Sequence, residues 1–463
     1  MRYSLYLMLL IIGGYSGAFA QVGTPCTCSS SGLPGRCINS SVTISQPGLY
    51  CLTQDIVSTS AFYIRADDVV LDGQGHKMTI QSDKFLGIAK GADPALPSFA
   101  IRTFNATVKN FNVVAKSLSF TEMIILDTVS NSTIENVTLK LIGGTSSTGA
   151  KLMGMYQSYL NRFVGNTFIM SAPSGGVDFF SIRNGTCGTQ FINNTFVGSN
   201  IPSGHFIKLN SGDQTLGRNA VGDTIFSGNR IYSNLDGILS QSHEPHTGVT
   251  LSNNLIYASG VGFDAGSPPD TWFEVNGNTI ISSAERPLHI GDTDDSNVRL
   301  GMKNNIFFAA GGDRVMDIHV ERINSNYNNF FSTVLPPLLW SKYDGQGALL
   351  GNPTIGCLSG CANSWKLSWR DNNSVSSGPT LAALFVDPVV NLNLDSNDNP
   401  ISLGDFHLKS TSGMIGIGEG GVNLGSTGGN GLNYPLFCGV SKPGLIPGDT
   451  TAPANPSNLR SSP

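Results

Sequence analysis

The sequence predicts an all-β protein of the solenoid class, in which one chain winds into a parallel β-helix. Three observations support this prediction: a short motif that repeats along the chain, the lack of helical stretches within the repeats, and an unusual composition. Of the 463 residues, 13% are charged and 55 are glycine. An ordinary soluble domain has about 25% charged residues, so the missing charge is replaced here by glycine and small polar residues.

The repeated motif is an asparagine followed, in most copies, by an apolar β-forming residue two positions later. Nine copies spaced 24 to 35 residues apart begin at Asn110, Asn136, Asn166, Asn194, Asn229, Asn254, Asn278, Asn305 and Asn329. A period of about 20–50 residues is typical of solenoids, propellers and arrays. Each unit contains two or three short strand-like runs and no helical stretch of about ten residues, so each unit is predicted to be one coil.

Stacking of coils explains both the asparagines and the low charge. Parallel strands in successive coils lie about 4.8 Å apart, so equivalent side chains stack directly on one another. Stacked like charges repel, whereas stacked amides can hydrogen-bond to each other as a ladder. Asparagine also tolerates the left-handed backbone that tight turns need.

Composition also excludes several classes of protein. A net charge of −5 without a basic block argues against nucleic-acid binding. The low net charge and the many aromatic and β-branched residues argue against a disordered chain.

The first twenty residues are predicted to be a secretory signal peptide. Arg2 precedes the apolar stretch Leu5–Ile12, and Ala18-Phe19-Ala20 has the small residues of a cleavage site before Gln21. The stretch is too short to span a bilayer, and no later stretch reaches the length of about 18 apolar residues that a span needs. We therefore expect a secreted protein, extracellular or at the cell surface, without a membrane span.

Eight cysteines in an exported chain favour disulfides. Four of them gather near the N-terminus and are expected to staple a cap: Cys26, Cys28, Cys37 and Cys51. Zinc is the alternative, but no histidine lies close in sequence to the two short-spaced pairs, Cys26/Cys28 and Cys357/Cys361. The connectivity stays open.

One elongated domain is expected. The predicted parts are the signal peptide (1–20), the Cys-rich cap (21–60), the coils (61–335), an irregular insertion with a C-terminal closing cap (336–440), and a Pro/Thr-rich linker or tail (441–463). The tail resembles linkers that lead into a further module, and a partner module after it stays an open alternative.

The beginning, middle and end of the coil region together resemble a known group. They are Pro47–Tyr50 with Ile64–His76, then the asparagine ladder, then Asp387-Pro388 with the segments 404–408 and 413–416. Over roughly residues 44–420 they resemble the right-handed parallel β-helix proteins of the pectin-lyase-like superfamily. The resemblance implies a right-handed helix and an extracellular polysaccharide as partner. The superfamily holds lyases, galacturonases, epimerases, tailspikes, adhesins and non-catalytic surface proteins, so it implies no single activity.

Candidate functional residues follow from the alternation of side chains in the middle coils. Apolar residues such as Ile207 and Phe263 are expected to point inward, so their neighbours point outward. The predicted outward row is Lys208, Gln241, Asp264, His289 and Asp317, with Asp236, His243, His246 and Arg286 nearby. Substrate grooves of β-helix carbohydrate enzymes lie along such a sheet. The alternative is an ordinary solvated face.

The chemistry of a polysaccharide lyase assigns roles to these residues. A cation must bind the uronate carboxylate, and a base must take the neighbouring proton. Lys208, Arg286, His289 and Asp264 are the predicted catalytic residues. The predicted substrate-binding residues are Asp236, His243, His246, Gln241 and Asp317.

Two other interpretations stay open. A glycoside hydrolase needs two carboxylates, and Asn234–Ile238 is similar to the galacturonase Asn-Thr-Asp-Gly motif, with Asp264 one coil later. However, the other galacturonase motifs and the lyase Gly-Glu-x-Glu run are absent from the sequence. A non-catalytic module for glycan binding, adhesion or surface structure is therefore the main alternative to a lyase.

One acidic run predicts a metal site. Asp292, Asp294 and Asp295 cluster in sequence, and Ca²⁺ prefers several oxygen ligands together. An ordinary acidic turn is the alternative interpretation.

Overall fold

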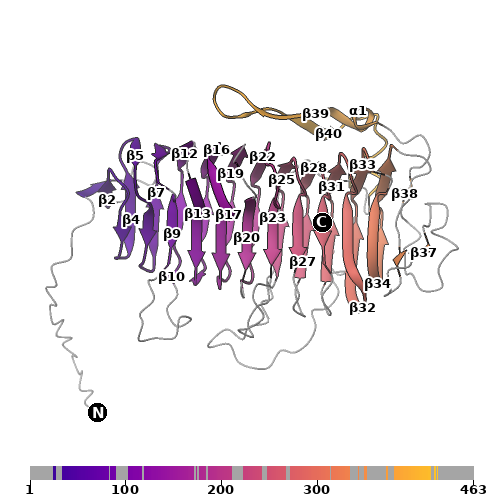
Figure 1. Cartoon of the computed structure of the whole chain (residues 1–463), viewed down its shortest axis with the longest axis horizontal. Helices are drawn as coiled ribbons and strands as arrows, with labels where there is room; N and C mark the ends of the chain where they lie inside the picture. Colours follow the sequence, from indigo (N-terminus) through magenta and orange to yellow (C-terminus); the bar gives the residue numbers. More distant parts are fainter. Residues whose placement is uncertain are drawn as a thin grey trace, which may run out of the picture.

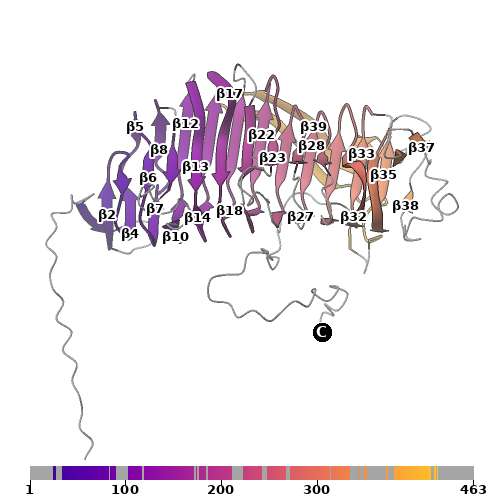
Figure 2. The same cartoon turned by 60° about the horizontal axis from the view of Figure 1, so that its bottom comes forward.

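The computed structural model describes residues 24–27, 34–82, 84–89, 103–116, 119–171, 174, 177–183, 186–210, 223–241, 248–266, 272–312, 314–333, 342–343, 349–351, 372–373, 380–418, 422–423 and 425. Parallel strands stack along the long axis of an elongated solenoid (Figure 1 and Figure 2). Among the described residues the one helix is α1 (Leu381–Leu384), of 4 residues. The prediction of an all-β parallel β-helix is confirmed.

Each coil contributes to three parallel stacks of strands, called sheets 1, 2 and 3 in the order in which the chain visits them. Sheet 1 contains β4 (Gly48–Leu52), β7 (Val69–Asp72), β11 (Thr107–Lys109), β15 (Thr133–Glu135), β18 (Arg162–Val164), β21 (Gln190–Ile192), β24 (Thr224–Ser227), β27 (Gly248–Ser252) and β30 (Trp272–Asn276).

Sheet 2 has 12 strands. They are β5 (Ile56–Ser58), β8 (Lys77–Ile80), β12 (Asn112–Lys116), β16 (Thr138–Ile142), β19 (Thr167–Ser171), β22 (Thr195–Ser199), β25 (Arg230–Ser233), β28 (Leu255–Ala258), β31 (Thr279–Ser282), β33 (Ile306–Ala309), β35 (Asn329–Ser332) and β38 (Asn372–Asn373).

Sheet 3 contains β3 (Thr43–Ile44), β6 (Phe62–Ile64), β9 (Leu86–Ile88), β13 (Ser119–Asp127), β17 (Thr145–Tyr156), β20 (Val177–Arg183), β23 (Ile207–Asn210), β26 (Ile238–Gln241) and β29 (Phe263–Ala265). The long strands β32 (Leu288–Lys303) and β34 (Met316–Asn326) continue both sheet 3 and sheet 1. Two short pairs complete the strands beside the coils: β10 (Thr103–Phe104) with β14 (Val129–Ser130), and β36 (Lys342–Tyr343) with β37 (Leu349–Gly351).

The hydrophobic core fills the interior of the coils. Inward side chains repeat at equivalent positions, and phenylalanines stack from coil to coil. The rings of Phe163 and Phe191 lie 4.9 Å apart, and those of Phe191 and Phe226 lie 4.8 Å apart. All three are fully buried. Such stacks fix the register, because a slip by one residue would turn them outward.

Seven buried asparagines form a continuous ladder at the turn from sheet 1 to sheet 2. They are Asn166, Asn194, Asn229, Asn254, Asn278, Asn305 and Asn328. Each Nδ2 donates to the Oδ1 of the next asparagine at 2.7–3.1 Å. That Oδ1 also accepts the backbone N–H of the same donor residue, at 2.8–3.0 Å. The buried amides therefore satisfy one another, as burial requires.

The ends of the predicted ladder need correction. Asn110 and Asn136 precede the ladder position, which Phe111 and Val137 occupy, and they have φ values of 57° and 52°. The late rung is Asn328 and not Asn329. The turn makes two demands on adjacent residues, a left-handed backbone first and a buried amide second. Asparagine suits both, so the motif alone could not separate them.

A C-terminal hairpin lies along the outer side of sheet 2 (Figure 1). It consists of β39 (Phe385–Leu394) and β40 (Pro400–Leu408), which pair antiparallel. It covers a second apolar cluster, made of buried outward residues of sheet 2 and of Leu384, Phe385 and Phe406. The segment 404–408 thus lies against the side of the coils.

The N-terminal region adds antiparallel β1 (Thr24–Thr27) and β2 (Pro34–Ile38), and β2 pairs with β4. Cys37 and Cys51 are opposite each other in that pairing. No free thiol is found among the cysteines that the structure describes. Within the same described ranges, no helix has the length and apolar character needed to cross a membrane.

Candidate functional site

The predicted polar row exists on sheet 3 and crosses five neighbouring strands. The pairing runs from Lys208 to Leu239, then to Asp264, to His289 and to Asp317. We call these residues the central row. The register thus brings four of the predicted polar residues into one row, but Gln241 is not in it: Gln241 pairs with Asn210, two positions further along the strands. Leu239 takes its place and is 3% exposed.

A second row, called the edge row, lies three residues before the central row in sequence, just ahead of each strand. Each member comes two residues before an inward-facing residue, and these inward residues, such as Ile207 and Ile238, pair with one another from strand to strand. They are His205, Asp236, Val261, Arg286 and Arg314. The two rows together bring Lys208, Asp236, Asp264, Arg286, His289 and Asp317 onto one face.

The closest pair of titratable groups in this site is His289 and Asp264. His289 Nδ1 lies 2.6 Å from Asp264 Oδ1, and both side chains remain partly exposed, at 13% and 24%. The two residues are paired across β29 and β32, so the backbone register sets the contact. A carboxylate in this position orients the imidazole.

Asp317 is held by two arginines. Its Oδ2 lies 3.5 Å from Nη1 of both Arg286 and Arg314. Asp317 is 4% exposed, whereas the arginine side chains are 29% and 24% exposed. A buried carboxylate between two guanidinium groups fixes their positions. Asp317, predicted as a substrate-binding residue, therefore positions cations beside the His289–Asp264 pair.

Asp236 is a carboxyl group of the site whose pKa is raised. Burial raises its pKa, the backbone N–H of Val261 opposes this by hydrogen bonding, and the nearby Asp264 raises it further. The N–H of Val261 donates to Asp236 Oδ1 at 2.8 Å. Asp236 and Asp264 thus form a pair of carboxyl groups in different environments, which is a common arrangement where one acts as an acid.

Several predicted residues lie outside the description. His243 and His246 fall outside the described residues, and the side chain of Gln241 does too. The backbone of Asp292, Asp294 and Asp295 belongs to β32, but their side chains are likewise not described. Within the described part of the chain, no group of three His, Cys, Asp or Glu residues is arranged to hold a metal ion.

Sequence reasoning missed His205 and Arg314, which share the edge row with Asp236 and Arg286. The sequence would have indicated Arg314 if the strand register had been known. Arg314 lies two residues before Met316, just as Arg286 lies two residues before Leu288, and Met316 pairs with Leu288. Alternation alone selected the central row.

A further polar cluster on sheet 3 was also missed. Lys151 Nζ donates to Glu122 Oε1 at 2.7 Å and to the Tyr156 hydroxyl at 2.8 Å. The Tyr156 hydroxyl donates to Glu122. Gly154 makes room for this cluster, since a Cβ there would lie 2.7 Å from Glu122 Oε1. The cluster is internally neutralised and lies upstream of the candidate site.

Comparisons with known proteins find only distant structural similarities. No protein-family model matches the chain, and no curated protein matches it. Among solved structures, pectate lyase Pel9A is similar with a TM-score of 0.32 and 14% identity, over 83% of this chain and 89% of that one. A protein titled Geobacillus virus E2 ORF18 is similar with a TM-score of 0.31 and 10% identity, over 64% of this chain and 53% of that one. The chain thus spans about half of the viral protein.

Proposed function

We propose that the protein binds an acidic polysaccharide across sheet 3 and cleaves it by β-elimination. One observation carries this proposal: the His289–Asp264 pair lies in the same two rows as Arg286, Arg314 and Lys208. A base and cations side by side are the two requirements of a uronate lyase.

The proposed reaction begins with the uronate carboxylate on Arg286. The Arg286 side chain is 29% exposed. Neutralising the carboxylate makes the C5 proton more acidic and stabilises the enolate. His289 Nε2 then accepts that proton, with Asp264 stabilising the imidazolium. The electron pair of the C5–H bond forms the C4–C5 double bond, the C4–O bond breaks, and the departing oxygen takes a proton from water. Lys208, two coils from Asp264 and thus about 10 Å away, binds a neighbouring sugar.

A second candidate function is hydrolysis of the same class of polymer. The raised pKa of Asp236, caused first by its burial and also by Asp264, supports it. In that reaction Asp236 would protonate the leaving oxygen while Asp264 acts as nucleophile or base. A non-catalytic glycan-binding module is the remaining alternative.

One assay separates these functions. The purified protein is incubated with alginate, pectate and chondroitin, each with and without Ca²⁺, and both ultraviolet absorbance and reducing ends are followed. Absorbance from an unsaturated product supports the lyase, and reducing ends without absorbance support hydrolysis. Neither signal, with binding retained, contradicts both enzymatic proposals. If Ca²⁺ activates the wild-type protein and this activation is lost in Asp294→Asn, the result would support the proposed calcium site at Asp292, Asp294 and Asp295.

We also propose that residues 1–20 direct secretion and that disulfides staple the N-terminal cap. The facing positions of Cys37 and Cys51 on β2 and β4 support the second point. Mass spectrometry of the protein from a secreting host should give Gln21 as the first residue. Non-reduced peptide maps should link peptides that contain Cys26, Cys28, Cys37 and Cys51. Free thiols at these positions would contradict the staple.

A further inference from the structure

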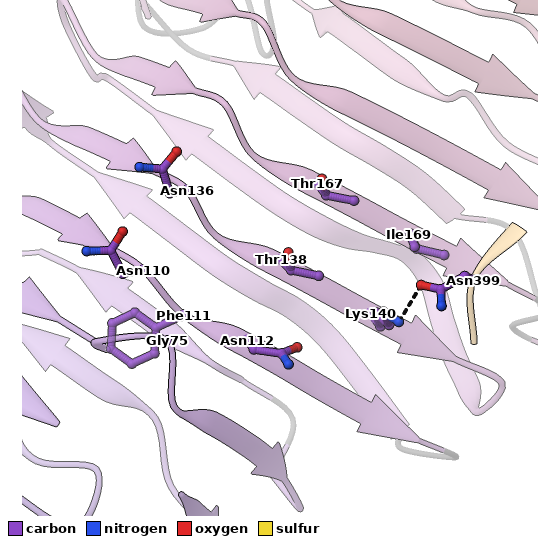
Figure 3. A pocket seen from close by; sticks show the side chains of 10 residues that line it. All are labelled: Gly75, Asn110, Phe111, Asn112, Asn136, Thr138, Lys140, Thr167, Ile169 and Asn399. Carbon is purple, nitrogen blue, oxygen red and sulfur yellow. Dashed lines mark hydrogen bonds between the residues drawn. The ribbon is translucent and has the colours of Figure 1, made fainter. Parts of the chain in front are cut away.

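Sheet 2 carries a groove of about 480 Å³ at the tip of the hairpin. Figure 3 shows lining side chains on β12, β16 and β19, with Asn399 of the hairpin beside Lys140. The groove lies on a different sheet from the His289–Asp264 pair. A volume of this size is within the usual range of small-ligand sites, about 300–1,000 Å³.

The groove exists because the hairpin is held above a polar stretch of the sheet. From Ile169 onward, outward residues of sheet 2 such as Val197 are apolar and pack beneath the hairpin. One coil earlier the paired position is Lys140. Lys140 Nζ donates to the backbone oxygen of Asn397 at 2.9 Å and to Asn399 Oδ1 at 2.7 Å.

A second cation supports the tip. Lys116 Nζ lies 2.6 Å from Asp398 Oδ2. The hairpin tip is thus tied by polar contacts to β12 and β16 instead of packing on them, and this leaves the space of the groove open beside Asn399.

The lining is made of amides and hydroxyls in register. Asn112 pairs with Thr138, and Thr138 with Thr167, so three polar side chains repeat about 4.8 Å apart on adjacent strands. Asn136 lies at the same groove, and Ile169 adds apolar surface. Among the described residues of the lining none is a carboxylate, and the ammonium group of Lys140 donates to two neutral oxygens of the hairpin tip.

We propose that this groove binds a short neutral oligosaccharide, independently of the polysaccharide at sheet 3. Threonine hydroxyls and asparagine amides both donate and accept hydrogen bonds, as sugar hydroxyls require. Their regular spacing presents such partners to successive hydroxyls of one extended ligand, and the apolar surface of Ile169 contacts the C–H faces of a ring.

The test uses the full-length protein from a host that does not N-glycosylate, because Asn136-Val137-Thr138 is a glycosylation sequence at the groove. Calorimetric titrations compare neutral hexasaccharides of glucose, mannose and xylose with a galacturonate hexasaccharide. The variant is the double replacement Thr138→Val and Thr167→Val, which keeps shape and removes the two hydroxyls. The matched control is Thr195→Val, since Thr195 continues the same row on β22 outside the groove.

We expect the wild-type protein to bind at least one neutral hexasaccharide. The affinity of the double variant for it should be at least tenfold lower, and that of Thr195→Val should lie within twofold of wild type. Unaltered circular dichroism and thermal midpoint confirm that the double variant is folded. Replacing His289 by Ala should leave this binding unchanged, which separates it from the proposed catalytic site. No binding of any neutral sugar, equal binding by the double variant, or loss of binding in His289→Ala would each overturn the proposal.

Discussion

Sheet 2 and sheet 3 share one inner architecture but have opposite outer faces. Outward residues of sheet 2, such as Tyr232 and Phe308, are apolar and lie under the hairpin. The equivalent face of sheet 3 carries Asp264 and His289 and remains partly exposed. The inner pattern therefore builds the solenoid, while the outer residues decide whether a sheet is covered by the chain itself or left open to a ligand.

The largest expected effect concerns the open face. Replacing His289 by Ala should lower the rate of uronate polymer cleavage by about 10²–10⁴-fold, the usual contribution of a general base. Thermal unfolding should change little, since the side chain is partly exposed. Initial rates under saturating polymer measure the effect.

A matched control exists on the covering hairpin. His407 Nδ1 lies 2.5 Å from Asp405 Oδ1, so it forms the same kind of pair away from sheet 3. His407→Ala should retain full activity. Equal losses in both variants would mean that the activity does not depend on sheet 3.

The next effect concerns the covered face. Phe385 is fully buried and packs against Phe406, with ring centroids 5.3 Å apart. Phe385→Ala should destabilise the hairpin contact by about 3–5 kcal/mol, the usual cost of emptying a buried phenylalanine site. Hydrogen exchange in β39 and β40 should accelerate while the coils stay protected. Val389→Ala on the same strand is the control, because Val389 is 64% exposed and should change stability by less than about 0.5 kcal/mol.

A smaller effect depends on alkaline pH. Burial beneath the hairpin raises the pKa of Tyr232 from 10.0 to about 12, with Arg230 opposing and Asp405 adding to the shift. A raised folded pKa gives stability that is complete below the unfolded value and is lost as pH rises through the folded value. Denaturation midpoints should therefore fall between pH 10.0 and about 12, and less steeply in Tyr232→Phe. An identical pH profile for the variant would contradict this account.

The smallest effect concerns Asp236 on the open face. Its raised pKa, due first to burial, means that ionisation opposes folding, so its contribution is lost as pH rises above the ordinary carboxyl range. Asp236→Asn keeps an acceptor for the Val261 N–H and should raise the thermal midpoint at pH 7 by at most about 2 °C. At pH 3 the difference should vanish. A lower midpoint at pH 7 would show that the charged form is the stabilising one.

The fold could be predicted because stacking imposes its period on the sequence. The spacing from Asn194 to Asn305 marks successive turns directly, and the buried ladder explains why these positions select asparagine. The central row was predicted from alternation for Lys208, Asp264, His289 and Asp317. Gln241 was misplaced because alternation from Ile238 turns both Leu239 and Gln241 outward, and only the pairing shows that Leu239 lies in the row.

The hairpin could not be predicted in the same way. Phe385 and Phe406 lie in the region that lacks the repeat, and their partners are outward residues of sheet 2 far away in sequence. Apolar residues such as Tyr232 and Phe308 break the alternation of a half-exposed strand. These outward apolar residues were the feature of the sequence that could have indicated a covering element, since a sheet that is apolar on both faces must be covered.

The asparagine ladder has a consequence for the length of the molecule. Each rung offers the same acceptor to one neighbour and the same donor to the other, so every rung is interchangeable with the next. A whole coil, added or removed between Asn194 and Asn305, would leave donors and acceptors matched. The ladder thus lets coils be inserted or deleted without unpaired amides, so the length of the solenoid can change in steps of one coil.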